Sequence, residues 1–224
     1  MSRQSVLRDE LRQADRTELR RRIVEGRSID PAAIEGFTYR GNSLGLPRAI
    51  EKLTWKTFQK TFWRDPRSGR LLGWNVRLHQ DGLDAPSRPK TNRAGEPVTT
   101  WFYEVLAPSE ERPPRAWPRG FDHGLIIDYA RAENPLTDTV RLVKDPLVAL
   151  EDGNADLLLG VSTVTLPGLC VETPTYFLLE REAPLSFVPA AARPRGEPQR
   201  PRHGFERRTA ELLFDAILGV EEPD

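Results

Sequence analysis

Residues 139–180 decide the fold, with the sequence TVRLVKDPLVALEDGNADLLLGVSTVTLPGLCVETPTYFLLE. The turn sequences Asp152-Gly153-Asn154 and Pro167-Gly168 separate apolar, β-branched runs at hairpin spacing. Lys144-Asp145 beside Pro146 is interpreted as a further turn. No run is followed by a helix of crossover length, so the pattern favours an antiparallel meander over a parallel α/β sheet. The strands expected here are 139–143, 147–150, 156–166 and 170–180.

The residues before this meander add further strands. Apolar side chains alternate with small or polar ones over 72–78, and residues 98–106 are β-branched and aromatic, so each run predicts a strand. Shorter extended runs are expected at 37–40 and 124–129. An open sheet of six to eight antiparallel strands would leave the backbone of its two edge strands unpaired. Closing the sheet into a barrel removes those edges, so we expect a closed or nearly closed barrel. The expected fold class is therefore mainly β (α+β by content), an antiparallel up-and-down barrel that is lipocalin/calycin-like, with N- and C-terminal helices.

Helical spacing and proline content set the expected domain organisation. Residues 5–25 predict an amphipathic helix, and the apolar spacing over 46–63 predicts a second helix that bends near Thr54. The whole chain is expected to comprise an N-terminal helix (1–30), a barrel (31–183), a Pro/Arg-rich linker or strap (184–208) and a C-terminal helix (209–224). The two terminal helices are candidates for a homodimer contact.

Three short motifs carry a resemblance to known families. Gly36-Phe-Thr-Tyr39-Arg-Gly41 precedes the expected helix, and Leu-Ile-Ile-Asp128-Tyr129 and Tyr176-Phe-Leu-Leu end later strands. Over residues 36–181 this order resembles the GXWXG group of uncharacterised bacterial proteins and, more remotely, lipocalin-type calycin barrels. Those patterns place Trp where this chain has Tyr39. The resemblance implies an up-and-down barrel that holds a small apolar molecule, and it implies no catalytic residues.

Composition excludes several classes of function. The chain has 33 Lys and Arg against 33 Asp and Glu, so no nucleic-acid binding is expected of the barrel. No apolar run is long enough to span a bilayer, and the first residues lack the apolar core of a signal peptide, which predicts a cytoplasmic protein. The single Cys170 excludes an intramolecular disulfide, and the three histidines lack metal-binding spacing. We therefore expect no metal and no cofactor.

The candidate catalytic groups are few. Asp128, between apolar neighbours, is expected to be either a structural ion-pair partner or a polar anchor at the base of a pocket. His123, beside Asp122, is a candidate acid or base. Gly41-Asn42-Ser43-Leu44-Gly45 matches the nucleophile elbow of α/β-hydrolases. Because too few strands precede it, we interpret it as a glycine-shaped turn from strand to helix.

Aromatic residues concentrate between Trp55 and Tyr103, where they would line a barrel pocket. The leading hypothesis is a barrel without a cofactor that binds a small apolar or amphipathic molecule. Its expected ligand-binding residues are Trp55, Trp74, Arg77, Trp101, Tyr103, Asp128 and Tyr176.

Two other classes of function stay open. One is a small tailoring enzyme of bacterial secondary metabolism that uses a barrel pocket, with Asp128 or His123 as acid or base. The other is a protein interaction module that acts through the basic tail and the terminal helices. Residues 193–208 contain six arginines and two glutamates, which suits an acidic partner.

Overall fold

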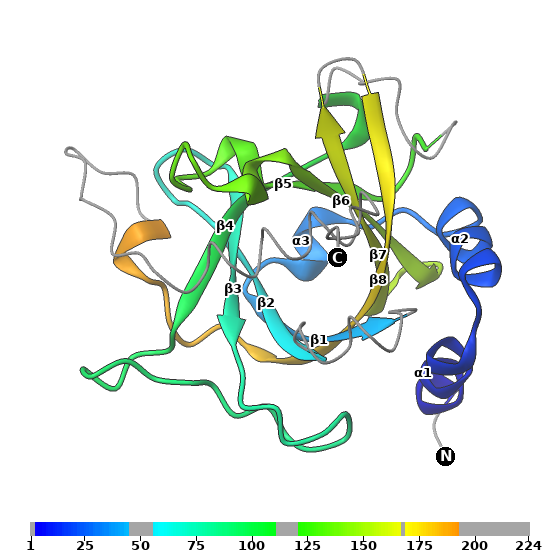
Figure 1. The fold of residues 1–224 in the computed structure, drawn as a ribbon, viewed down its shortest axis with the longest axis horizontal. Helices are drawn as coiled ribbons and strands as arrows, with labels where there is room; N and C mark the ends of the chain where they lie inside the picture. The colour runs from blue at the N-terminus through cyan, green and yellow to red at the C-terminus, as the bar shows by residue number, and fades with distance from the viewer. Residues whose placement is uncertain (1–2, 45–55, 111–120, 167–168, 193–224) are drawn as a thin grey trace, which may run out of the picture.

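The computed structural model describes residues 3–44, 56–110, 121–166 and 169–192. Its eight strands form one closed antiparallel barrel in which each strand pairs with its neighbours in sequence and β1 pairs with β8 (Figure 1). The up-and-down barrel expected from the sequence is thus confirmed. The strands are β1 (Phe37–Leu44), β2 (Thr57–Arg64), β3 (Leu71–Arg77), β4 (Thr99–Leu106), β5 (Leu125–Asp128), β6 (Val143–Glu151), β7 (Asn154–Leu166) and β8 (Leu169–Pro184).

The last three strands form the expected meander. Glu151 pairs with Asn154 at the β6–β7 hairpin, where Gly153 has a positive φ of 67° that suits glycine. Leu166 pairs with Leu169 at the β7–β8 hairpin. Long strands and tight connections therefore follow from the turn sequences that separate the apolar runs.

Two expected elements are wrong. Strand β6 continues through Lys144-Asp145-Pro146, where a turn was expected, and Pro146 pairs with Ile126 of β5. Residues Thr139–Leu142, expected to be a strand, form the 3₁₀ segment η3, because the Asp138 carboxylate accepts a hydrogen bond from the Val140 N–H at 3.0 Å. The side chain of an aspartate thus competes with the strand pattern at this position.

A third error concerns the helix expected over 46–63. Residues Thr57–Arg64 form strand β2 instead. Phe58 and Phe62 are four positions apart, which fits one face of a helix but also one face of a strand. Pairing with β1 and β3 on either side selects the strand. Residues 46–55 of that predicted helix lie outside the described residues.

Side chains inside the barrel form one core that includes Tyr39, Phe62, Tyr103, Ile127, Leu147, Leu158, Phe177 and Leu179. Helix α3 (Pro31–Ile34) begins at an Asp30 cap and adds Ile34, which is fully buried in this core. Figure 1 shows α3 within the ring of strands. The barrel is consequently filled with apolar side chains at the end where β1 begins.

The N-terminal helices cover the outer surface of β6–β8. Helices α1 (Arg3–Gln13) and α2 (Arg16–Val24) divide the single helix expected over 5–25, because Asp15 caps α2 by accepting from the Glu18 N–H at 2.9 Å. Leu11, Leu19 and Ile23 pack against Val148, Leu157, Leu159 and Tyr176. Of the helices that the structure describes, none is long and apolar enough to cross a membrane.

The segment after β8 covers the opposite outer surface. Leu185 and Val188 pack beside Trp74 and Val76, and the short η4 turn (Ala190–Ala192) adds Ala192 to this cluster. The Leu185 N–H donates to the Gly36 carbonyl at 2.7 Å. The expected C-terminal helix lies outside the described residues. The remaining 3₁₀ segments are η1 (Pro108–Glu110) and η2 (Tyr129–Arg131).

Candidate functional site: a buried polar centre in the barrel

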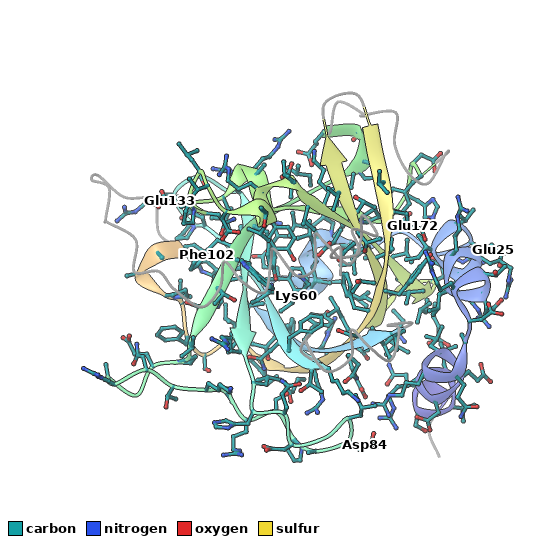
Figure 2. The ribbon with its side chains drawn as sticks, in the orientation of Figure 1. Glu25, Lys60, Asp84, Phe102, Glu133 and Glu172 are labelled. Carbon is teal, nitrogen blue, oxygen red and sulfur yellow. The ribbon has the colours of Figure 1, made fainter. Side chains whose placement is uncertain are left out.

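A lysine lies inside the barrel. Successive residues of a strand point to opposite faces, so Lys60 shares the interior face of β2 with Phe58 and Phe62. Its side chain is only 3% exposed. Figure 2 shows Lys60 within the ring of strands. Lysine is rarely buried to this extent without partners, so its surroundings define the candidate site.

Lys60 has three polar partners from three other segments. Its Nζ donates hydrogen bonds to the Tyr129 hydroxyl at 2.5 Å and to Asn75 Oδ1 at 3.2 Å, and it lies 3.4 Å from Asp145 Oδ2. The Tyr129 hydroxyl donates to the same Asp145 oxygen at 2.9 Å. We call Lys60, Asn75, Tyr129 and Asp145 the polar centre. Asn75 comes from β3, Tyr129 from η2 and Asp145 from β6.

Aromatic rings surround the Lys60 ammonium. The centroids of Tyr103, Tyr129, Phe177 and Phe58 lie 4.9, 5.1, 5.3 and 5.7 Å from Nζ. Ring faces carry partial negative charge, so they stabilise a cation at these distances. These four rings therefore give the polar centre an apolar surface that also attracts a positively charged group.

Two glycines let these rings lie against the barrel wall. A Cβ placed on Gly41 would lie 2.2 Å from a ring carbon of Phe58, and one on Gly160 would lie 2.2 Å from a ring carbon of Phe177. A close approach of this kind is one use of glycine in a strand. The positions of both phenyl rings around Lys60 thus depend on small residues in the neighbouring strands.

Burial shifts the titration of the polar centre in opposing directions. It lowers the pKa of Lys60, and the nearby Asp145 carboxylate offsets part of that effect. Burial likewise raises the pKa of Asp145, opposed by the Lys60 charge and the Tyr129 hydrogen bond. The pKa of Tyr129 is raised well above its usual range, chiefly by burial. Burial thus brings the pKa values of the lysine and the aspartate closer together than they are in water, which favours the sharing of one proton between them.

The two ends of the barrel differ in polarity. The end at which β1 begins holds Ile34 and Phe62 with other apolar side chains. Toward the opposite end, Lys60 and Asn75 enter the interior, and Phe58, the first interior residue of β2, is only partly buried. The polar centre is therefore nearest to the barrel end at which β2 begins.

The predicted ligand-binding residues divide between the interior and the outer surface. Tyr103 lies in the interior beside Lys60, and Trp101 packs against the same core with a positive φ of 49°. Arg77 pairs with Phe58 in the β2–β3 register, near the polar centre's end of the barrel. Trp74 and Tyr176 belong to the two outer clusters. Trp55 lies outside the described residues.

Trp74 contributes to a different hollow. A groove of about 320 Å³ lies between the outer surface of β2 and β3, the loop over 87–97 and the segment after β8. Trp74 is fully buried at this groove, and its Nε1 has no hydrogen-bond partner among the described residues. The predicted aromatic residues consequently do not converge on one pocket.

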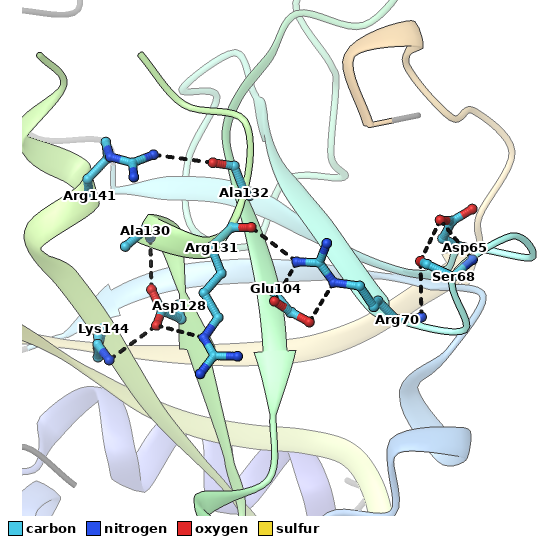
Figure 3. A network of polar contacts seen from close by, with 10 residues as sticks. All are labelled: Asp65, Ser68, Arg70, Glu104, Asp128, Ala130, Arg131, Ala132, Arg141 and Lys144. Carbon is cyan, nitrogen blue, oxygen red and sulfur yellow. Dashed lines mark hydrogen bonds and ion pairs between the residues drawn. The ribbon is translucent and has the colours of Figure 1, made fainter. Parts of the chain in front are cut away.

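Asp128 lies in an ion-pair network on the outer surface of the barrel (Figure 3). Its carboxylate lies 3.1 Å from Lys144 Nζ and 3.7 Å from Arg131 Nε, and it accepts from the Ala130 N–H at 2.8 Å. Glu104, on the neighbouring strand, pairs with Arg70. Of the two expectations for Asp128, the structural ion pair agrees with this geometry. The polar anchor inside the barrel is instead Lys60 and its partners.

The other candidate catalytic groups also lie apart from the polar centre. The His123 ring contacts Asp122, at 3.2 Å from Nδ1, and the ring of Phe121. Ser43 lies within strand β1, so the expected turn from strand to helix at Gly41–Gly45 is wrong for its first four residues. A nucleophile elbow needs that turn, so the hydrolase interpretation loses its structural basis.

None of the four residues of the polar centre, Lys60, Asn75, Tyr129 and Asp145, was among the predicted site residues. Lys60 alternates with Phe58 and Phe62, a polar residue on an apolar face, but that signal was hidden by the helical interpretation. Asp145 was assigned to a turn because Pro146 follows it. A charged residue on the apolar face of a strand was therefore the signal that could have located the site.

Comparison with known proteins gives no assignment, because neither a protein-family model nor a curated protein matches the sequence. The resemblance to GXWXG and calycin proteins stays a prediction. Within the part of the chain that the structure describes, no cluster of three or more His, Cys, Asp or Glu residues is placed to hold a metal ion.

Proposed function

We propose that the barrel binds a small amphipathic molecule in its interior, entering at the end where β2 begins. The observation that carries this proposal is the polar centre itself. A buried ion pair contributes little to stability, and well-packed apolar residues of similar volume are often as stable or more so. Perturbed, buried titratable groups concentrate at functional sites. A binding role therefore explains the burial of Lys60 and Asp145 better than a contribution to stability does.

The polar centre favours a particular kind of ligand. Lys60 and Asp145 together carry no net charge, so a neutral polar group such as a carbonyl or hydroxyl fits beside them without adding an unpaired charge. The rings of Phe58, Tyr103 and Phe177 supply apolar and aromatic contact for the rest of the molecule. An amphipathic ligand with a neutral polar end agrees with both features.

Binding of the neutral fluorophore Nile red tests this proposal, together with native mass spectrometry of the purified protein for bound molecules. The double variant Lys60→Met/Asp145→Leu removes the charged pair of the polar centre without leaving an unpaired charge. We expect it to bind Nile red at least tenfold more weakly. Asp128→Asn, on the outer surface, is the control and should bind within about twofold of the wild type. Equal binding by the double variant, or no ligand and no Nile red bound by the wild type, would contradict the proposal.

A further inference from the structure

Lys60 is placed for covalent chemistry as well as for hydrogen bonding. Its amine lies beside a hydroxyl and a carboxyl group that also contact each other, and aromatic rings exclude water from all three. Burial disfavours the charged ammonium form of a lysine. A desolvated lysine is therefore a free amine for a larger share of the time, and the lone pair of the free amine is the nucleophile. A neighbouring proton donor and acceptor supply what the condensation of an amine with a carbonyl group requires.

We infer that Lys60 captures an aldehyde or ketone group of the bound molecule as an imine, with Tyr129 and Asp145 moving the protons. This inference rests on the proposed function, because the carbonyl compound must first enter the barrel. It names the chemical class of the ligand: an amphipathic molecule whose polar end is a carbonyl group.

The step balances within the polar centre. The Lys60 Nζ lone pair forms a bond to the carbonyl carbon, the carbonyl π electrons move to oxygen, and one proton of Nζ passes by way of the Tyr129 hydroxyl to that oxygen. The resulting carbinolamine loses its oxygen as water, using the proton held by Asp145, and the C=N bond forms. Lys60 amine, Asp145 carboxylic acid and a carbonyl compound thus give a protonated imine, an Asp145 carboxylate and one water molecule. No oxidant or reductant is needed.

The contacts of the polar centre suit the product as well as the reactant. A protonated imine keeps one N–H donor and a positive charge, for which Asp145 Oδ2 is the adjacent counter-ion. The Tyr129 hydroxyl, 2.9 Å from the same carboxylate oxygen, connects Asp145 to Nζ and provides the route for the proton. The rings around Nζ stabilise the cationic imine as they stabilise an ammonium. The site is therefore organised for the charge that the reaction generates.

We expect a carbonyl compound to enter from the barrel end at which β2 begins. Phe58 is the interior residue of β2 next to Lys60, on the side of the barrel end at which β2 begins, and it is only partly buried. The other side is filled by Phe62 and Ile34, which are fully buried. A chain-like carbonyl compound that enters past Phe58 places its carbonyl group at Lys60 and leaves its apolar part among the rings.

The test is reductive trapping of the full chain with a series of aldehydes from hexanal to dodecanal. At pH 6, sodium cyanoborohydride reduces a protonated imine to a stable secondary amine, which raises the intact mass by that of the aldehyde less one oxygen atom. Peptide mapping locates the modified lysine. At pH 6 an unperturbed lysine amine is free only about once in 25,000 molecules, so a desolvated lysine stands out. We expect Lys60 to be trapped at least tenfold faster than the more accessible Lys90.

Four variants make the result specific. Lys60→Met and Lys60→Arg should both abolish trapping at that position, and the arginine variant keeps the positive charge if the methionine variant folds poorly. Tyr129→Phe should slow trapping about tenfold or more because it removes the proton route. Lys90→Met is the control and should leave trapping at Lys60 unchanged. Tyr129→Phe trapped as fast as the wild type would remove Tyr129 from the proton route.

The matched alcohols, hexanol to dodecanol, separate this inference from the proposed function. An alcohol binds without an imine, so displacement of Nile red by alcohols reports occupancy of the barrel alone. If alcohols displace the dye but no aldehyde is trapped at Lys60 faster than at Lys90, the imine inference is wrong and the binding function stands. If neither alcohol nor aldehyde displaces the dye or is trapped, both are wrong.

Discussion

Removing one member of the Lys60–Asp145 pair should make the stability of the barrel depend on pH in a direction set by the member that remains. Lys60→Met leaves a buried carboxyl group, and Asp145→Leu leaves a buried amine. Each remaining group avoids an unpaired buried charge by becoming neutral. The pKa of Asp145 is raised and that of Lys60 is lowered by burial in the wild type, and removing the partner strengthens both shifts because the partner opposed them.

The magnitude follows from proton uptake. An unfolded aspartate has a pKa of about 3.9, so keeping Asp145 protonated in folded Lys60→Met costs about 1.5 kcal/mol at pH 5 and about 4 kcal/mol at pH 7. Its folded pKa is above its unfolded pKa, so stability is present at low pH and falls as the pH rises, by about 1.4 kcal/mol per pH unit. Asp145→Leu has the opposite sign, because a lysine with a lowered pKa releases a proton on folding and stability rises with pH.

The wild type and the double variant Lys60→Met/Asp145→Leu provide the reference. The wild-type pair holds one proton in total whether it is an ion pair or a neutral pair, which equals the count in the unfolded chain between about pH 5 and pH 8. The double variant holds none in either state, so neither slope should appear in it. Urea unfolding followed by circular dichroism at several pH values measures the difference from the wild type. Parallel pH profiles for all four proteins, within about 0.5 kcal/mol, would refute the reasoning.

Three further predictions concern the frame around the polar centre, each measured by urea unfolding. Gly160→Ala should lower the free energy of unfolding by about 1–3 kcal/mol, because the added Cβ would meet the Phe177 ring. Adding Phe177→Leu should recover part of this loss. No recovery would mean that the ring is not the obstacle. Asn134→Ala should lower the free energy of unfolding by about 2–3 kcal/mol. The Asn134 side chain accepts a hydrogen bond from the Phe102 N–H at 3.0 Å and donates to the Phe102 and Tyr129 carbonyls at 2.6 and 2.8 Å. A loss under about 0.5 kcal/mol would show that water replaces these hydrogen bonds. Leu19→Asp should lower the free energy of unfolding by about 3 kcal/mol or more, because Leu19 is fully buried. Val24→Asp, on the exposed face of α2, is the control and should change it little. Similar losses for the two variants would show that α2 is not held by its buried face.

The sequence predicted the architecture because its strongest signals are local. Glycine-containing turns between apolar runs specify consecutive hairpins, alternation over β3 indicates its apolar face, and β-branched and aromatic residues indicate β4. Asp15 shows where local signals were overlooked, since a good N-cap residue in the middle of an apolar stripe divides one helix into two.

The candidate site depends on relations that a single sequence does not contain. Asp128 and Asp145 both follow or precede apolar residues, yet one points outward to Lys144 and the other inward to Lys60. A shift of one position along a strand exchanges the two faces, so the assignment of an aspartate to the interior requires the register. The meeting of Lys60 with Tyr129 across 69 positions is a consequence of barrel closure, and spacing along the chain gives no indication of it.

Closure of the barrel by β1 and β8 also has a kinetic consequence. The Thr38 hydroxyl bonds the Ala183 carbonyl across 145 positions, so the first strand acquires its second neighbour only after the last strand exists. At typical rates of synthesis that interval is on the order of 10 s, during which one edge of β1 is unpaired. Contacts of such long range slow folding, because the entropy of closing the loop is lost before the contact forms. A nascent chain of this protein therefore presents an open sheet edge to chaperones, or to other nascent chains, until its final hairpin leaves the ribosome.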